Sequence, residues 1–293
     1  MKETVITVDS SCDMLLEDCE KINVFPIKLK YSIDNVVYED SMNEEKQKIF
    51  YDKMRSGIMP KTSQINVGEF VDFWTPFIKQ GKAVVQLVVG SGVSGTYNNA
   101  VNAKNEILQT YPDAELYVVD STAGSGALAA QVYKAAQLRD SGYSAKDIVA
   151  WLETNARRFH IVYTTDDLKY LYLGGRLKKS KFLIAKALGI KPLMKLSYEG
   201  HLFVSEKVRG KQAVIKKITD EIVTTAVNFK EETLYVAHSD ALEAAKEAVK
   251  YIMTHCKFAN VKYLQMGATI GAHAGPGLIA FCYYGMDRPH EAI

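Results

Sequence analysis

The chain has 293 residues, more than one domain usually contains, so its length predicts two domains. Apolar residues make up 47% and charged residues 24%, which is the balance of a soluble globular protein with an ample core. Lys and Arg number 36 against 34 for Asp and Glu. The net charge of +2 argues against a broad nucleic-acid-binding surface, which needs clustered basic residues.

The cysteines and the N-terminus indicate a cytoplasmic protein. No two cysteines form a CxxC pair or sit near a histidine at zinc-ligand spacing, so reduced thiols are expected. The first residues, MKETVITVDS, lack the apolar stretch and cleavage site of a signal peptide. No apolar run reaches the ~20 residues that a membrane helix needs. The four cysteines are Cys12, Cys19, Cys256 and Cys282.

The first half of the chain alternates strands and helices. Asn43 is expected to cap a helix that stops at Gly57, and a loop, MPKTSQI, follows it. The expected strands cover 4–10, parts of 22–38, 82–89 and 114–120, and the expected helices cover 43–57, 69–81, 96–110, 123–141 and 145–158. This order predicts a largely parallel sheet that is covered by helices.

The second half has a different pattern. It starts with a strand at 160–165 and a short helix at 166–175, followed by two strands around a Glu199-Gly200 turn. A helix over 211–228, a strand over 233–239 and a helix through Lys250 come next, and two last strands flank a glycine-rich turn. We therefore predict two α/β domains, 1–158 and 159–293, the second with a mixed sheet.

A glycine-rich segment follows the strand at 82–89. Gly90, Gly92 and Gly95 match G-x-G-x-x-G before a helix, and Asp120 lies where a ribose-binding acid could sit. A dinucleotide site is one interpretation and a plain strand-to-helix turn is another. Some 80 residues of structured chain precede the motif, and it carries hydroxyls that a nucleotide site does not require, which weakens the first interpretation.

Hydroxyl clusters occur in two loops. Ser94 and Thr96 can donate to an anion at the start of a helix, or one of them can cap that helix. The sequence around Ser94 is G-x-S-G-T, which is not the nucleophile elbow of a serine hydrolase. Thr62-Ser63-Gln64 is the second cluster, with helix capping again as the alternative.

Two further segments present a cation or an imidazole. The turn GAHAGPG displays His273 among glycines, where it can pair with a carboxylate or phosphate. Gly174-Gly175-Arg176 closes a short helix and leaves a guanidinium that is able to bind an anion, or that is simply solvated. The nearby KKSK run at 178–181 is typical of a solvated face, though it could orient a partner protein.

These motifs together, in this order along most of the chain, resemble the DegV family. The shared elements are Val8-Asp9-Ser10-Ser11, Thr62-Ser63-Gln64, Ser91-x-x-Ser94-Gly95-Thr96-Tyr97, Val119-Asp120-Ser121, Leu168-x-x-Leu171-x-x-Gly174-Gly175-Arg176-Leu177, Ile190-Lys191-Pro192, Lys207-Val208-Arg209-Gly210 and His273-x-Gly275-Pro276-Gly277. Each motif alone is weak, but eight in the expected order are specific.

The resemblance implies a two-domain α/β protein that buries one long-chain fatty acid between its domains. It also implies a substrate-presenting subunit of a fatty acid kinase, in which a separate ATP-binding subunit forms the acyl phosphate for phospholipid synthesis. The residues that it assigns to the carboxylate are Thr62, Ser63, Ser94, Gly95, Thr96 and His273, and those near the headgroup or the kinase-facing surface are Arg176 and Gly275.

The sequence carries no motif for phosphoryl transfer or for binding a metal ion. The sequence has no G-x-x-x-x-G-K-[ST] P-loop and no acids spaced to hold Mg²⁺, so we expect no catalysis by the chain itself, no metal and no cofactor. The alternatives are a nucleotide-dependent oxidoreductase built on the Gly90 loop and a regulator that binds another small carboxylate. Candidates for lining the tail tunnel are Phe70, Phe73, Trp74 and Leu128, with core packing as the alternative role of each.

Overall fold

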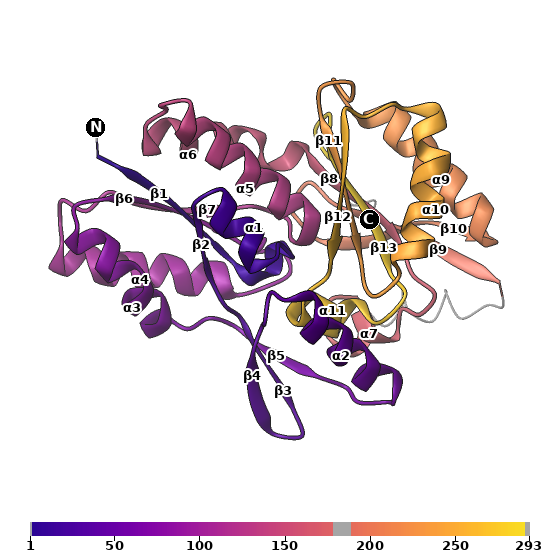
Figure 1. The fold of residues 1–293 in the computed structure, drawn as a ribbon, viewed down its shortest axis with the longest axis horizontal. Helices are drawn as coiled ribbons and strands as arrows, with labels where there is room; N and C mark the ends of the chain where they lie inside the picture. Colours follow the sequence, from indigo (N-terminus) through magenta and orange to yellow (C-terminus); the bar gives the residue numbers. More distant parts are fainter. Residues whose placement is uncertain (1, 178–188, 291–293) are drawn as a thin grey trace.

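A computed structural model describes residues 2–177 and 189–290 and shows two separate main sheets with helices around them (Figure 1). The expected KKSK face at 178–181 lies outside the described residues. The predicted fold class is confirmed, because one main sheet is wholly parallel and the other is mixed. No helix among the described residues combines the length and the apolar character needed to cross a membrane.

The first sheet has the strand order β2-β1-β6-β7, and all of its pairs are parallel. Its two central strands are buried along their whole length, as expected for a parallel sheet covered on both faces. Helices α3 and α4 pack on one face and α5 and α6 on the other. The strands are β1 Thr4–Asp9, β2 Val24–Ile27, β6 Ala83–Val88 and β7 Leu116–Asp120, and the helices are η1 Ser10–Cys12, α1 Leu16–Lys21, α3 Val67–Lys79, α4 Thr96–Thr110, α5 Ser125–Asp140 and α6 Ala145–Asn155.

A small antiparallel sheet with the order β4-β3-β5 projects from this half, beside helix α2 (Figure 1). Asn43 caps α2 by accepting a hydrogen bond from the Lys46 amide, as predicted. The expectation that MPKTSQI is only a loop is wrong, since its centre forms β5 and pairs with β3. The bounds are β3 Lys30–Ile33, β4 Val36–Glu39, α2 Glu44–Arg55 and β5 Lys61–Ser63.

The second main sheet has the order β10-β9-β8-β13-β11-β12, in which only β11 and β12 are parallel neighbours. Helices α9 and α10 cover one face, over a core that includes Val162, Val236 and Phe281. The strands are β8 Phe159–Thr164, β9 Ile190–Leu196, β10 Leu202–Arg209, β11 Thr233–His238, β12 Asn260–Gln265 and β13 Ile279–Tyr284, and the helices are η2 Ala156–Arg158, α7 Lys169–Leu173, α9 Lys211–Thr225, α10 Leu242–His255 and α11 Ala268–Ala274.

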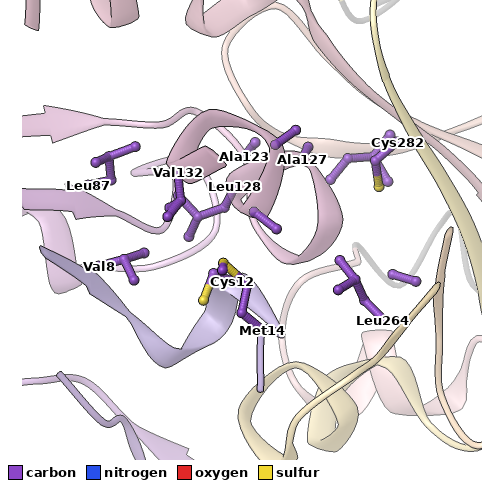
Figure 2. Packing of buried hydrophobic residues seen from close by; sticks show 14 of the residues in the cluster. Val8, Cys12, Met14, Leu87, Ala123, Ala127, Leu128, Val132, Leu264 and Cys282 are labelled. Carbon is purple, nitrogen blue, oxygen red and sulfur yellow. The ribbon is translucent and has the colours of Figure 1, made fainter. Parts of the chain in front are cut away.

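Helix α5 joins the two halves, because it packs against β1 of the parallel sheet and against β8, β11 and β13 of the mixed sheet. Its first eight residues are all buried, so this part of the helix lacks the polar face of a surface helix. Leu128 and Val132 face Leu87 and Val8, whereas Ala127 lies toward the mixed sheet (Figure 2). One hydrophobic core therefore continues from one sheet to the other.

Helix α11 corrects the prediction for the end of the chain. The glycine-rich segment between the last two strands was expected to be a turn, but residues 268–274 form a helix with His273 in its final turn. Gly271 permits this helix to pack closely, because a Cβ there would lie 2.5 Å from the Tyr51 hydroxyl oxygen. The four cysteines are buried, and no disulfide joins them.

Candidate functional site

A cavity of about 320 Å³ lies between the two main sheets. The loops that follow β6 and β7 form one wall, the mixed sheet forms another, and α7 and α11 contribute the rest. Most of the lining side chains are apolar, and many of them come from the strands of the mixed sheet. The apolar lining residues are Leu29, Val89, Val93, Ala123, Ile161, Tyr163, Leu171, Leu196, Leu202, Met266, Ile270, Ala274, Leu278 and Ala280.

Four separate segments bring polar groups together at this cavity. The closest contact joins the Thr62 Oγ1 atom of β5 to the His273 Nε2 atom of α11, at 2.8 Å. Ser94 lines the cavity from the loop after β6, and Arg176 lines it from the end of α7. Ser63 and Gln64 also line it and are exposed, which places the polar groups beside an opening to solvent. Five of the predicted site residues therefore line one cavity: Thr62, Ser63, Ser94, Arg176 and His273.

His273 is neutral at pH 7 in this environment. Burial, with a smaller contribution from the positive charge of Arg176, lowers the pKa of His273 from 6.5 to about 4. Its Nδ1 atom is buried without a hydrogen-bond partner among the described residues. Gly174 lies against this atom so closely that a Cβ would come within 2.2 Å of it. Any side chain at position 174 would therefore collide with the imidazole of His273.

Ser94 is held by the start of α4. Its Oγ atom accepts a hydrogen bond from the Thr96 amide at 3.2 Å and lies 2.9 Å from the Thr96 Oγ1 atom. Thr96 is fully buried and does not line the cavity, so it supports Ser94 instead of facing a ligand. Gly95 does not line the cavity either, because the Gln64 side chain packs over it.

Arg176 links α7 to the Ser94 loop. Its Nε atom donates to the Val93 carbonyl at 3.0 Å, and its Nη1 atom donates to the Gly174 carbonyl at 2.6 Å. Burial lowers the pKa of Arg176, although the guanidinium stays protonated near neutral pH. The side chain is thus fixed at the cavity wall and is not a freely solvated helix cap.

Gly275 does not line the cavity. It ends α11 with a φ of 71°, a conformation that favours glycine, and a Cβ there would lie 2.0 Å from the Tyr170 ring. The absence of a side chain at Gly275 therefore allows α11 and α7 to pack closely.

The alternative that Thr62-Ser63-Gln64 caps the following helix is wrong, since Asn66 and Glu69 form the capping box of α3.

The geometry of the Gly90 loop does not favour a dinucleotide site. A Cβ on Gly90 would lie 2.7 Å from backbone atoms of the 122–123 segment, and one on Gly92 would lie 2.6 Å from the Gly200 carbonyl oxygen. These glycines therefore face other protein backbone and not a pyrophosphate. The Asp120 carboxylate accepts hydrogen bonds from the Ser91 hydroxyl and the Thr122 amide, so it is already engaged.

The tail-lining residues were not found from the sequence. Phe70, Trp74 and Leu128 are buried in the core, Phe73 packs on that core, and none of the four lines the cavity. Leu196 and Leu202, which flank the β9–β10 turn, line it instead. Ser11, in the early Asp-Ser-Ser motif, also lines the cavity, although the sequence assigned it no role at the site. The motif was the one available signal, because strands buried on both faces do not show which face meets a cavity.

No group of three or more His, Cys, Asp or Glu side chains in the described ranges is arranged to hold a metal ion.

Comparison with known proteins places the chain in a family. A family model described as "Uncharacterised protein, DegV family" matches residues 3–285. A DegV domain-containing protein of Clostridium perfringens is 34% identical over 286 residues, which cover 97% of this chain and 98% of the relative.

Solved structures agree in fold. A DegV lipid-binding protein from Thermotoga maritima superimposes with a TM-score of 0.86 at 25% identity, covering 98% of this chain and 100% of the other. A stearic-acid-binding protein from Eubacterium ventriosum superimposes with a TM-score of 0.84 at 25% identity, covering 96% and 97%. The family match over nearly the whole chain and the similarity to the clostridial protein lead to one conclusion: this chain belongs to the DegV family.

Proposed function

We propose that this protein binds one long-chain fatty acid in the cavity, with the carboxylate at Thr62, Ser94 and His273 and the tail among the apolar residues. The observation that carries the proposal is the cavity itself, which is apolar along most of its wall and carries hydroxyls and an imidazole beside an exposed edge. The two parts that enclose the ligand are residues 1–158 and 159–293. The site of action is the cytoplasm.

The tail supplies the favourable free energy of binding. Each buried methylene contributes about 0.8 kcal/mol, so a 16-carbon tail contributes on the order of 10 kcal/mol before the losses of association. This estimate fits a cavity whose walls are mainly leucine, isoleucine, valine and alanine side chains. The same walls offer little to a short polar carboxylate, which favours a long-chain acid over another small carboxylate.

The carboxylate must be compensated, because an unpaired buried charge costs several kcal/mol. Ser94 can donate a hydroxyl hydrogen bond, and the hydrogen-bonded pair of Thr62 and neutral His273 can donate one more, either from the Thr62 hydroxyl or from the imidazole N–H. Arg176 adds a positive charge at the same wall. The solved relatives support a fatty acid as the ligand, since one is described as lipid-binding and another as binding stearic acid.

The fatty acid is presented to a separate ATP-dependent kinase subunit, which converts the carboxylate to an acyl phosphate for phospholipid synthesis. The position of the headgroup residues supports this step, because Ser63 and Gln64 lie at the exposed edge of the cavity and leave a carboxylate oxygen within reach of a partner. In this scheme Ser94 and His273 hold the substrate, and the kinase subunit supplies ATP and the phosphoryl-transfer chemistry.

A two-stage experiment tests the proposal. Delipidated protein is first titrated with stearate by calorimetry, with NADH as the control for the dinucleotide alternative; saturable binding of stearate alone is expected. The loaded protein is then incubated with ATP and the host's kinase subunit, and acyl phosphate is trapped with hydroxylamine. Saturable NADH binding without stearate uptake would overturn the binding proposal, and binding without acyl phosphate would overturn the presentation step.

A further inference from the structure

Two buried carboxylates hold the end of α11 opposite to His273. The Asp13 Oδ1 atom accepts a hydrogen bond from the Gly267 amide at 2.8 Å, and the Asp40 Oδ2 atom accepts one from the Thr269 amide at 3.2 Å. Asp13 follows β1 and Asp40 follows β4, whereas α11 comes more than 220 residues later in the chain. The exposed fractions of the two aspartates are 2% and 1%.

These contacts are tight and lie at the start of a helix, where backbone amides lack partners within the helix. A carboxylate satisfies such amides and interacts favourably with the helix dipole. Gly267 is required for the approach, because a Cβ there would lie 2.8 Å from the Asp40 Oδ2 atom. Tyr51 adds a third contact from α2 by donating its hydroxyl to the Met266 carbonyl at 2.9 Å.

The aspartates have no cationic partner in the described ranges that would explain their burial, since no salt bridge to either is found there. Burial raises the pKa of both carboxyl groups above the usual value of an aspartate. Keeping two such groups in a protein interior costs free energy unless their hydrogen bonds offset it. The hydrogen bonds that they receive from α11 are among the few that do so.

His273 is six residues after Gly267, which corresponds to about 9 Å along the helix. His273 lies in the last turn of α11, and Thr269, Ile270 and Ala274 of the same helix line the cavity. A shift of the helix start therefore moves the imidazole relative to Thr62, which is fixed separately in β5. The contact of 2.8 Å between them tolerates little displacement.

We propose that Asp13 and Asp40 are positioning residues for the fatty-acid headgroup, which hold α11 so that His273 meets Thr62 at the cavity. The inference rests on the proposed function for its ligand, but the alignment of His273 with Thr62 is a property of the protein before any acid binds. Neither aspartate lines the cavity, so both act through the helix.

The test compares variants that remove the acceptor with one that keeps it. Asp13→Ala and Asp40→Ala should weaken stearate binding by about ten-fold, the equivalent of one lost headgroup hydrogen bond. Asp13→Asn should restore binding to within about two-fold of the unmodified protein, because a carboxamide oxygen can still accept from the Gly267 amide. Asp147→Asn, an exposed acid in the first turn of α6, is the matched control and should bind as the unmodified protein does.

A spectroscopic signature separates positioning from general destabilisation. The imidazole ¹⁵N signals of His273, assigned with His273→Ala, report its hydrogen bond to Thr62 in acid-free protein. They should shift in Asp13→Ala and Asp40→Ala and stay in place in Asp13→Asn and Asp147→Asn. If the alanine variants do not fold, Gly267→Ala perturbs the same contact from the helix side, with Gly68→Ala at the start of α3 as its control.

The outcomes are distinct. Unchanged His273 signals in folded Asp40→Ala, or in Gly267→Ala if the aspartate variants do not fold, would overturn the positioning role. Shifted signals with unchanged stearate affinity would show that α11 moves without serving the headgroup, which also contradicts the inference. Failure of the unmodified protein to bind stearate would instead remove the proposed function, while the ¹⁵N signals would still decide whether the aspartates align His273.

Discussion

At the scale of single residues, the candidate headgroup site relies on uncharged donors. Thr62, Ser94 and His273 converge on the cavity, and His273 is kept neutral by burial and by Arg176. Neutral donors let the empty site exist without an unpaired buried charge among these three groups. When a carboxylate arrives, the nearby guanidinium and the imidazole both become favourable partners for it.

Ser94→Ala should weaken stearate binding and acyl-phosphate formation while the fold survives. The lost hydrogen bond to a charged group is worth roughly 1.5–3 kcal/mol, or about 10- to 150-fold in affinity. Titration calorimetry measures the change, and Ser141→Ala, at the exposed end of α5, serves as the control. An unaltered affinity in Ser94→Ala would remove this serine from the site.

The pKa of His273 should rise when the fatty acid binds. In the empty protein it is lowered to about 4, so the ring is neutral from pH 7 down to about pH 5. A carboxylate within hydrogen-bond distance stabilises the protonated ring, which moves the pKa back toward 6.5 or above it. An NMR titration with and without stearate measures this shift, with exposed His255 as the internal reference. Identical His273 titrations in both states would place the carboxylate elsewhere.

Sequence motifs pointed to the candidate headgroup residues one at a time, but not to the contact between them. Thr62 and His273 are 211 positions apart, and only the packing of α11 against β5 brings them together. Gly95, Thr96 and Gly275 belong to the same motifs yet do not line the cavity. A motif marks a segment that has a particular backbone shape, and it does not show which of its side chains faces the ligand.

At the scale of elements, α11 carries the site and was the element least visible in the sequence. Its seven residues contain Gly271 and are followed directly by Gly275-Pro276-Gly277, and glycine and proline at this density are typical of turns. Packing against α2, α7, β3 and β5 makes the helix stable despite its short length. Likewise β5 has only three residues and no apolar alternation, so its pairing with β3 could not be predicted.

Substitution of Gly275 tests the junction between α11 and α7. Gly275→Ala places a Cβ against the Tyr170 ring in a backbone conformation with φ 71°, whereas Gly277→Ala has φ 94° but open space around it. Gly275→Ala should therefore lower the free energy of unfolding more than Gly277→Ala does, by about 1–3 kcal/mol. Urea unfolding curves measure both. Equal losses would mean that the contact with Tyr170 does not constrain this end of α11.

At the scale of the whole molecule, helix α5 and the cavity lie between the same two sheets. Helix α5 lies between the two sheets (Figure 1), and the core around it fixes one sheet relative to the other. The loops after β6 and β7 border the cavity. Ligands of parallel α/β sheets bind beyond the carboxyl ends of the strands, and this cavity follows that rule.

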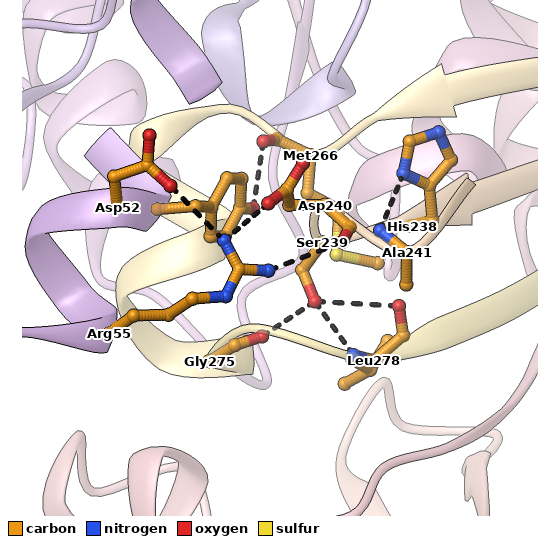
Figure 3. A network of polar contacts seen from close by, with 10 residues as sticks. Asp52, Arg55, His238, Ser239, Asp240, Ala241, Met266, Gly275 and Leu278 are labelled. Carbon is orange, nitrogen blue, oxygen red and sulfur yellow. Dashed lines mark hydrogen bonds and ion pairs between the residues drawn. The ribbon is translucent and has the colours of Figure 1, made fainter. Parts of the chain in front are cut away.

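Polar contacts add to the connection between the halves. Arg55 of α2 forms an ion pair with Asp240 (Figure 3). The Ser239 hydroxyl donates a hydrogen bond to the Gly275 carbonyl and accepts one from the Leu278 amide, in the segment that follows α11 (Figure 3). The ion pair joins the two halves next to Ser239, and Ser239 in turn holds the residues that directly follow the segment carrying His273. The position of that segment is therefore set by both halves of the molecule and not by α11 alone.

The alternation of strands and helices was enough to predict the two main sheets and their parallel and mixed character. The way in which the sheets pack was not predictable, because the first half of α5 is buried all round and has no polar face to indicate its neighbours. The cavity lining depended on that packing, which is why the aromatic candidates Phe70 and Trp74 proved to be core residues.

Native mass spectrometry of the purified protein tests the central claim most directly. We predict one bound long-chain fatty acid per chain, which is identified after extraction and is displaced in proportion by added stearate. Mixed occupancy by acids of several lengths would still support the claim. A protein that carries no acid and takes up none on mixing would contradict it.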